Sequence, residues 1–223
     1  MLSFSFLLFL ATAAALPATL VNKRAANVLI PTVRIANGTV IGLQVGTVEN
    51  FKGVPFAKPP VGPLRLKPPQ PLSRGFGIFT TQLNPNSCPQ FFTQFDRSNL
   101  PSSVISLLAN SPFLQEATQQ SEDCLTVNVQ RPAGTTSSSK LPVVVWFFGG
   151  GFEFGSTQIY DATSLITTSV TLKKPVLYVA VNYRVGGFGF LAGREVKADG
   201  STNLGLKDQR FFSCLKLLFF CSG

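Results

Sequence analysis

The sequence predicts an α/β fold in which a small antiparallel strand meander precedes the early strands of a mostly parallel sheet. Residues 143–148 (VVVWFF) indicate the parallel part, because a short β-branched and aromatic run between Pro142 and Gly149 is typical of a strand buried on both faces. Residues 33–54 indicate the meander, since short apolar stretches alternate there with turn residues. With 45% hydrophobic and 13% charged residues, the 223-residue chain is expected to fold.

Residues 1–15 are interpreted as a signal peptide. Residues 2–10 are almost wholly apolar, and Ala13 and Ala15 follow in the A-x-A arrangement of a cleavage site. The apolar run is too short to span a bilayer, and an N-terminal membrane anchor is the alternative. Lys23-Arg24 resembles a dibasic processing site that would extend the removed segment to about residue 24, or it is a plain charged pair. We therefore expect a secreted, extracellular protein with no integral membrane segment after signal removal.

Charge and composition argue against two classes of ligand. The net charge is +9, but the basic residues are spread singly along the chain, so we predict no nucleic-acid partner. The sequence contains no histidine, which excludes imidazole metal ligands and an imidazole base from these residues. We predict no metal site and no cofactor.

The first turn of the meander is expected at Asn37-Gly38. Asn-Gly is the preferred dipeptide of a two-residue type I′ hairpin. Asn37-Gly38-Thr39 is also a glycosylation sequon, which suits an exposed turn of a secreted protein. We predict a hairpin here, with Asn37 as a glycosylation site.

Three glycines, residues 149–151, follow the expected strand at once. Glycine allows positive φ and lets the backbone approach a ligand closely, so this turn offers bare N–H groups to an anion. A nucleotide-binding loop is excluded because the sequence has neither G-x-G-x-x-G nor a Gly-Lys-Ser/Thr after the glycines. A tight turn without chemistry is the remaining alternative.

Several motifs together resemble the type-B carboxylesterase/lipase family. The Pro- and Gly-rich residues 51–65, which we expect to be rigid and irregular, are similar to its F-x-G-V-P-F-A-x-P-P-x-G-x-x-R motif. Residues 121–129 look like its E-D-C-L-x-x-N-V signature. Its N-Y-R, G-F-L and N-x-G-L-x-D-Q-R blocks look like residues 182–184, 189–191 and 203–210. Phe148 stands before the glycines where many members carry His, which resembles the fungal lipase branch.

The resemblance implies the N-terminal part of an α/β-hydrolase, left incomplete, and a serine ester hydrolase acting on an ester or lipid substrate. The glycine turn would then be the oxyanion-hole loop, with the backbone N–H groups of Gly150 and Gly151 as donors. Phe148 and Phe152 would line the substrate-binding pocket, and core packing is their alternative role.

The resemblance also implies a disulfide and a salt bridge. In an oxidising compartment Cys88 and Cys124 should pair, as they do in the family. The enclosed segment would be the lid of the lipase branch, with residues 101–110 as a helix; a plain surface helix is the alternative. Arg65 and Glu122 are expected to form a salt bridge near the base of this lid, unless they are unrelated surface charges. Two further cysteines remain, Cys214 and Cys221.

The last residues depart from the family pattern. Members continue with a Gly-x-Ser-x-Gly nucleophile elbow, and the acid and the His of the triad would lie later still; the sequence contains no G-x-S-x-G and no His. We therefore divide the chain into the signal peptide, residues 25–210 as the N-terminal portion of the family domain, and residues 211–223 as an aberrant apolar tail. The predicted function is a truncated secreted ester hydrolase, inactive as written. The alternative is a non-catalytic, cholinesterase-like binding or adhesion protein.

Overall fold

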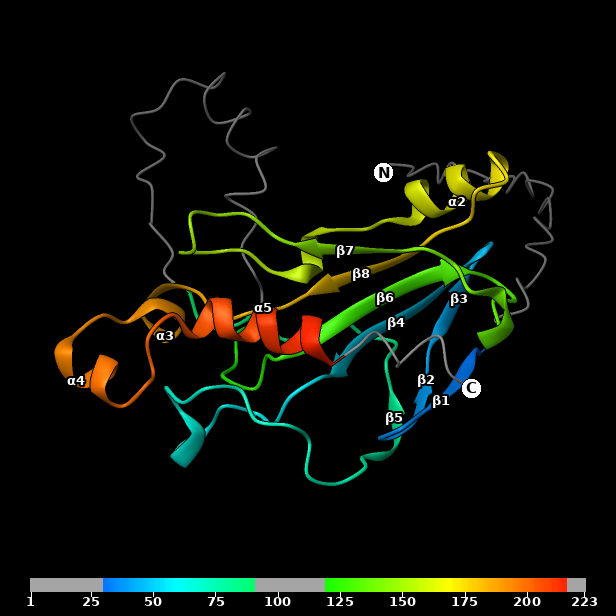
Figure 1. The fold of residues 1–223 in the computed structure, drawn as a ribbon. Coiled ribbons are helices and arrows are strands. Elements are labelled where there is room, and N and C mark those ends of the chain that lie inside the picture. The colour runs from blue at the N-terminus through cyan, green and yellow to red at the C-terminus, as the bar shows by residue number, and fades with distance from the viewer. Residues whose placement is uncertain (1–29, 91–118, 216–223) are drawn as a thin grey trace, which may run out of the picture.

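A computed structural model describes residues 30–90 and 119–215 (Figure 1). The predicted signal peptide, the dibasic pair at residues 23 and 24, the helix at 101–110 and Cys221 lie outside the described residues. The described chain forms two sheets, one of three strands and one of five, with helices on both faces of the larger sheet.

The smaller sheet has the strand order β1-β2-β5. Strand β1 (Thr32–Ile35) pairs antiparallel with β2 (Gly38–Ile41), and β2 pairs parallel with β5 (Gly77–Thr80). The predicted hairpin is present, but its two loop residues are Ala36 and Asn37, and neither has a positive φ. A type I′ turn at Asn37-Gly38 was therefore a wrong prediction. A Cβ on Gly38 would lie 2.3 Å from the carbonyl oxygen of Gly77, so this glycine permits close packing of β2 on β5.

The larger sheet has the order β3-β4-β6-β8-β7. Its strands are β3 (Leu43–Val45), β4 (Val48–Pro55), β6 (Thr126–Pro132), β7 (Val143–Phe147) and β8 (Leu177–Val181). Successive neighbours from β3 to β8 pair antiparallel, whereas β7 and β8 pair parallel. The segment expected to be irregular from residue 51 onward is therefore regular strand as far as Pro55, interrupted by a register shift between Phe51 and Val54 where Gly53 has φ 75°.

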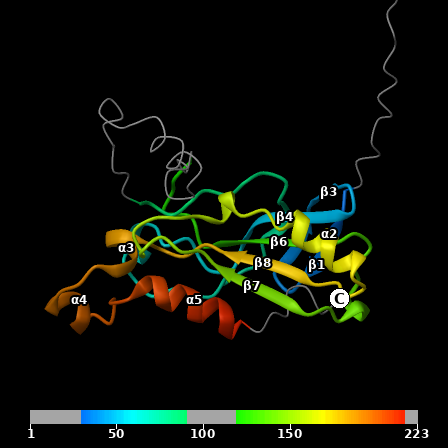
Figure 2. The same ribbon diagram turned by 90° about the horizontal axis from the view of Figure 1, so that it is seen from above.

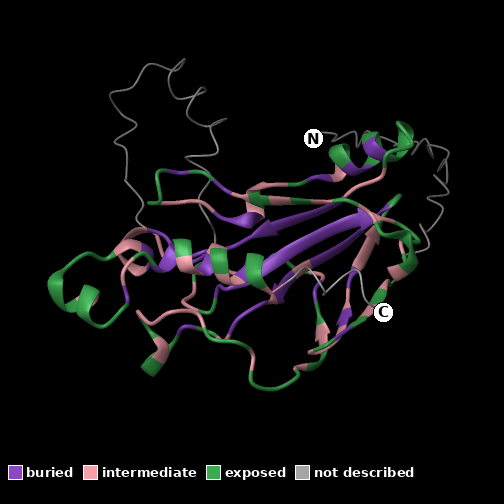
Figure 3. Ribbon diagram, viewed as in Figure 1, coloured by how far each residue is buried: buried purple, intermediate pink, exposed green. Residues whose placement is uncertain are grey.

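The side chains of β8 divide the core into two layers. Leu177, Val179 and Val181 face the main cluster, into which α5 (Leu204–Cys214) inserts Phe212. Tyr178 and Ala180 face the other way, toward Ile166 of α2 (Thr163–Thr171). The two helices consequently lie on opposite faces of the sheet, as the two views show (Figures 1 and 2). Every residue of β8 is buried (Figure 3).

Strand β7 lies at the edge of the sheet and is not buried on both faces, so that prediction was wrong. Its burial alternates, and Val144 and Trp146 are 38% and 41% exposed. The apolar run was read correctly as a strand, but no strand of the described part pairs with its outer edge. Burial on both faces belongs instead to its neighbour β8, which lies between β6 and β7.

Short helices lie between the strands and between β8 and α5. They are η1 (Gly62–Leu64), η4 (Ser137–Ser139), η5 (Thr157–Ile159), α3 (Gly186–Phe190) and α4 (Arg194–Ala198). The boundary that we placed after residue 210 falls inside α5, where Phe212 is buried and meets the ring of Phe56 edge-on at 5.6 Å. The division into domain and tail stays a prediction. Among the described residues, no helix has the length and apolar character needed to cross a membrane.

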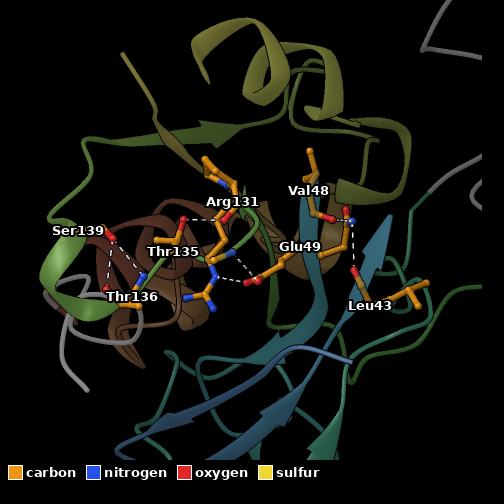
Figure 4. A network of polar contacts seen from close by, with 10 residues as sticks. Leu43, Val48, Glu49, Arg131, Thr135, Thr136 and Ser139 are labelled. Carbon is orange, nitrogen blue, oxygen red and sulfur yellow. Dashed lines mark hydrogen bonds and ion pairs between the residues drawn. The ribbon is translucent and has the colours of Figure 1, made fainter. Parts of the chain in front are cut away.

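A buried ion pair joins β4 to β6 (Figure 4). Glu49 and Arg131 are directly opposite in the strand register, and Arg131 Nε donates to Glu49 Oε2 at 2.7 Å. The other carboxylate oxygen accepts from the backbone N–H of Gly134 at 3.0 Å, and the guanidinium lies 5.1 Å from the ring centroid of Phe51. The buried charges of Glu49 and Arg131 thus compensate each other.

Candidate functional site

The glycine turn leaves the carboxyl end of β7. Gly150 has φ 140° and Gly151 has φ 63°, a region that favours glycine. A Cβ on Gly150 would lie 2.0 Å from the carbonyl oxygen of Phe154, whereas one on Gly151 would meet nothing within 4 Å. Close approach therefore requires glycine at position 150, and backbone conformation favours it at position 151.

The turn presents two adjacent backbone donors. The N–H groups of Glu153 and Phe154 turn back onto the Gly150 carbonyl at 3.0 and 3.4 Å. Within the described part of the chain, the N–H groups of Gly150 and Gly151 have no hydrogen-bond acceptor. Gly151 is exposed, so an oxygen-bearing ligand can reach this part of the turn. Two neighbouring free N–H groups are the arrangement that binds a localised negative charge.

The two phenylalanines that we predicted to bind substrate differ in surroundings. Phe148 is buried, its ring stacks on Tyr183 at 4.3 Å, and its carbonyl accepts the Tyr183 hydroxyl at 2.6 Å. Burial raises the pKa of Tyr183 to about 12, so the hydroxyl keeps its proton at neutral pH. Phe152 is 49% exposed and lies 4.7 Å from the ring of Phe190. Phe148 thus packs beneath the turn, whereas Phe152 is exposed beside it.

Buried amides fix the chain just beyond the turn. Asn182 Oδ1 accepts the Thr157 N–H at 3.0 Å, and Asn128 Nδ2 donates to the Thr157 carbonyl at 3.4 Å. Asn182 Nδ2 also donates to the Asn86 carbonyl at 3.1 Å. The Thr157 Oγ1 atom is buried without a partner among the described residues. The backbone of η5 is therefore tied to β6 and to the end of β8.

The N-Y-R and D-Q-R motifs meet in a buried ion pair. Arg184 donates from Nε and Nη2 to the two carboxylate oxygens of Asp208 at 2.8 and 2.7 Å, and its backbone N–H donates at 3.1 Å. Burial raises the pKa of the Asp208 carboxyl, and the hydrogen bonds and charge of Arg184 oppose that rise. Arg184 Nη1 also reaches the Lys67 carbonyl at 2.8 Å. These motif residues join three segments and are not placed to react.

Cys88 and Cys124 form the predicted disulfide, with Cα atoms 5.0 Å apart. Nearby, Arg65 Nε lies 2.8 Å from Glu122 Oε2, with side-chain exposures of 56% and 20%. Cys214 is exposed and has no disulfide partner in the part of the chain that the structure describes. Asn37 lies in the hairpin loop, where its glycosylation stays a prediction. Among the described residues, no cluster of His, Cys, Asp and Glu could hold a metal ion.

Comparison with known proteins decides the family. A model of the carboxylesterase family matches residues 30–211. The chain belongs to the carboxylesterase family. It is 53% identical over 193 residues to a protein named secreted lipase 1 of Botryotinia fuckeliana, covering 85% of this chain and 33% of that protein. The crystal structure of EstA from Aspergillus niger superposes with a TM-score of 0.67 at 30% identity, over 83% of this chain and 32% of EstA.

A more distant carboxylesterase relative is an inactive carboxylesterase-like protein, VdtD of Byssochlamys spectabilis. It is 34% identical over 79% of this chain, which covers 28% of it. The chain thus spans about a third of the length of the curated relatives it matches. The likeness to EstA supports the predicted partial α/β-hydrolase fold.

Sequence reasoning missed two contacts that hold the carboxylesterase glycine turn. The Gly186 N–H donates to the Phe152 carbonyl at 2.6 Å, and the side chain of Gln90 bonds to Gly155. Gly186 is the first residue of α3, and its glycine-rich surroundings carried a weak signal. A lone glutamine after Cys88 carries none, because its partner is 65 residues away.

Proposed function

We propose that this chain forms the oxyanion-binding part of a secreted carboxylic ester hydrolase that uses a Ser-His-acid mechanism on ester or lipid substrates. The observation that supports it best is the pair of N–H groups at Gly150 and Gly151, for which the described residues supply no acceptor. The family match and the secreted lipase relative support the reaction class and the extracellular location.

The two donors would bind the negative oxygen of the tetrahedral intermediate. In such a mechanism Ser attacks the ester carbonyl, His carries its proton and an acid orients that His. Each oxyanion donor is worth about 3–4 kcal/mol of transition-state stabilisation. Because the sequence has no histidine and no G-x-S-x-G, these 223 residues would supply the donors that bind the oxyanion, but neither the Ser nucleophile nor the His that carries its proton.

We assign the substrate contact to Phe152, since this residue is 49% exposed and follows Gly151 directly. Phe148 was predicted to share this role, and its burial under the turn supports packing. In the proposed site, Phe152 and Phe190 together would present an aromatic surface to the acyl or alcohol group of an ester.

A non-catalytic binding or adhesion protein is the second candidate. The inactive relative and the absence of histidine from these residues favour it. The genomic sequence downstream of the Arg210 codon separates the two. A reading frame that encodes G-x-S-x-G supports the hydrolase, and its absence supports the binding protein.

The oxyanion role is tested in a chimera. Residues 30–211 of this chain replace the matching stretch of the Botryotinia fuckeliana secreted lipase, and Gly150 is replaced by glycolic acid, which removes its N–H without adding a side chain. We expect kcat for p-nitrophenyl ester hydrolysis to fall about 10²–10³-fold while KM changes little. The matched control places glycolic acid at Gly46, in the turn between β3 and β4. An active chimera whose kcat is unaffected at Gly150 would contradict the proposal.

A further inference from the structure

The side chain of Gln90 forms hydrogen bonds with both the backbone N–H and the backbone carbonyl of Gly155, which follows the glycine turn. Its Oε1 accepts the Gly155 N–H at 2.8 Å, and its Nε2 donates to the Gly155 carbonyl at 3.2 Å. A primary amide matches a peptide group in this way because it carries one acceptor and one donor side by side. The pairing also fixes which end of the Gln90 amide is oxygen.

The remaining donor and the backbone of Gln90 are also engaged. Nε2 donates to the Cys88 carbonyl at 3.2 Å, and the Gln90 N–H donates to Gln120 Oε1 at 3.0 Å. We call residues 87–90 and 119–124, which surround the Cys88–Cys124 disulfide, the disulfide base. Its two segments are further joined by Ser87, whose N–H donates to the Gln119 carbonyl at 2.9 Å and whose carbonyl accepts the Ser121 N–H at 3.0 Å. Gln90 is therefore part of a segment that the disulfide and these hydrogen bonds hold in place.

Gly155 is linked to the glycine turn by the residue before it, Phe154, which contacts Gly150. The preceding residue, Phe154, donates its N–H to the Gly150 carbonyl at 3.4 Å. Its own carbonyl lies so close to Gly150 that a Cβ there would be 2.0 Å away. Gly155 itself lies on the ring of Phe148, since a Cβ on it would be 2.3 Å from Phe148 Cδ2. A shift of Gly155 must consequently move Phe154 and the backbone of Gly150.

We propose that Gln90 is a positioning residue that couples the disulfide base to the glycine turn and so sets the direction of the Gly150 and Gly151 N–H groups. Its catalytic consequence rests on the proposed oxyanion function, whereas the coupling is a property of these residues alone. The turn has a second anchor at the Phe152 carbonyl, which accepts the Gly186 N–H. Gln90 holds the end of the turn that α3 does not reach.

Hydrogen exchange of the full chain tests the coupling. At low micromolar concentration, mass spectrometry with fragment ions follows the amides of Glu153, Phe154 and Gly155. We expect Gln90→Met to lower their protection about tenfold, since both side-chain hydrogen bonds to Gly155 are lost, while Val179 in β8 keeps its protection. The matched control is Gln82→Met, which removes a side-chain hydrogen bond to the Gly42 carbonyl. Unchanged protection at Gly155, or an equal loss at Val179, would overturn the proposal.

A conservative variant adds a pH profile that a purely structural role would not produce. In Gln90→Glu the ionised carboxylate accepts the Gly155 N–H but opposes the Gly155 carbonyl, whereas the protonated acid both accepts and donates. Protection at Gly155 should therefore rise as the pH falls through about 4, near the ordinary glutamate pKa. Protection in Gln90→Met should show no such step. A Gln90→Glu profile without the step would contradict the proposed bonding of residue 90 to Gly155.

Reduction of the Cys88–Cys124 disulfide tests whether the disulfide base acts on the turn through Gln90. In the wild-type chain, reduction should lower protection at Gly155 and Glu153, and in Gln90→Met it should lower them no further. An equal additional loss in both proteins would show that the coupling runs elsewhere. None of these measurements reads catalysis, so failure of the ester-hydrolase proposal would leave them standing. Failure of the proposed Gln90 coupling would likewise leave the glycolic acid result to decide the oxyanion role.

Discussion

At the scale of single residues, Gly150 and Gly155 pack closely on their surroundings because they have no Cβ. Gly150 faces a backbone oxygen, Gly155 faces the Phe148 ring, and Gly151 faces open space. The same substitution at these three positions therefore separates steric overlap from backbone strain.

We expect Gly150→Ala and Gly155→Ala to destabilise the fold by about 3 kcal/mol or more, because overlap adds to the strain of φ near 140° and 131°. Gly151→Ala should cost only about 1–2 kcal/mol, the strain of a left-handed residue without overlap. Urea midpoints of the three variants measure the order. Equal costs at all three positions would show that packing against the turn is looser than described.

The carboxylate of Asp161 should make stability depend on pH. Hydrogen bonds from Gln130 and Thr163 hold the pKa of this group below its ordinary value. A lowered folded pKa contributes stability above the unfolded value of about 3.9, and that stability is lost as the pH falls through the folded pKa. The difference in unfolding free energy between wild type and Asp161→Asn should be largest near pH 7 and shrink below about pH 4. A difference that stays constant with pH would contradict this account.

At the scale of elements, two Glu–Arg pairs join different segments in different surroundings. Glu49 and Arg131 join β4 to β6 with side chains 9% and 8% exposed, whereas Arg65 is 56% exposed in its pair with Glu122. Removing one partner of a buried pair leaves an uncompensated charge, and removing one partner of an exposed pair leaves a hydrated one.

Glu49→Ala should therefore cost about 3–5 kcal/mol of unfolding free energy, because Arg131 keeps its buried charge. Glu122→Ala, the matched change, should cost about 0–1 kcal/mol. Chemical denaturation of both variants against wild type measures the contrast. Similar costs for the two would show that water reaches Arg131 freely.

Sequence patterns predicted where strands and turns occur better than they predicted which segments pack beside them. The β-branched run at 143–147 predicted a strand, but its edge position depends on β8, which lies 30 residues onward and inserts beside it. Asn37-Gly38 predicted a hairpin, but the turn lies one residue earlier, and Gly38 is already in β2, where it packs closely on Gly77. Gly150 and Gly151 could be proposed from the sequence because a run of glycines is a local pattern. Gln90 was not, because its contact with Gly155 is decided only by the folded chain.

At the scale of the whole molecule, the edge strand β7 exposes apolar side chains at one side of the larger sheet. Val144 and Trp146 carry no neighbouring charge within the strand, and a strand edge without charge invites pairing with another chain. We expect Val144→Lys with Trp146→Lys to increase the soluble monomer fraction, measured by size-exclusion chromatography with light scattering. The control is Leu83→Lys, at a residue 83% exposed outside the strands. Equal gains in both variants would point to net charge as the cause.

The purified 223-residue chain should hydrolyse no ester above background. Acyl transfer needs a nucleophile, a base and an oxyanion site, and the sequence supplies candidates only for the last. The assay uses p-nitrophenyl esters with the soluble fraction, beside a variant in which Gly150 and Gly151 are both Pro. Turnover that saturates with substrate and vanishes in this variant would reveal a catalytic centre that we have missed.

The position of β8 between β6 and β7 has a consequence for synthesis on the ribosome. Strands β6 and β7 emerge first, yet they never pair with each other in the finished sheet. Each must wait with an open edge until residues 177–181 appear, which takes a few seconds at ordinary elongation rates. During that interval a chaperone that binds extended apolar segments would find two open strand edges on the nascent chain, one on β6 and one on β7, and the arrival of one five-residue strand would cover both.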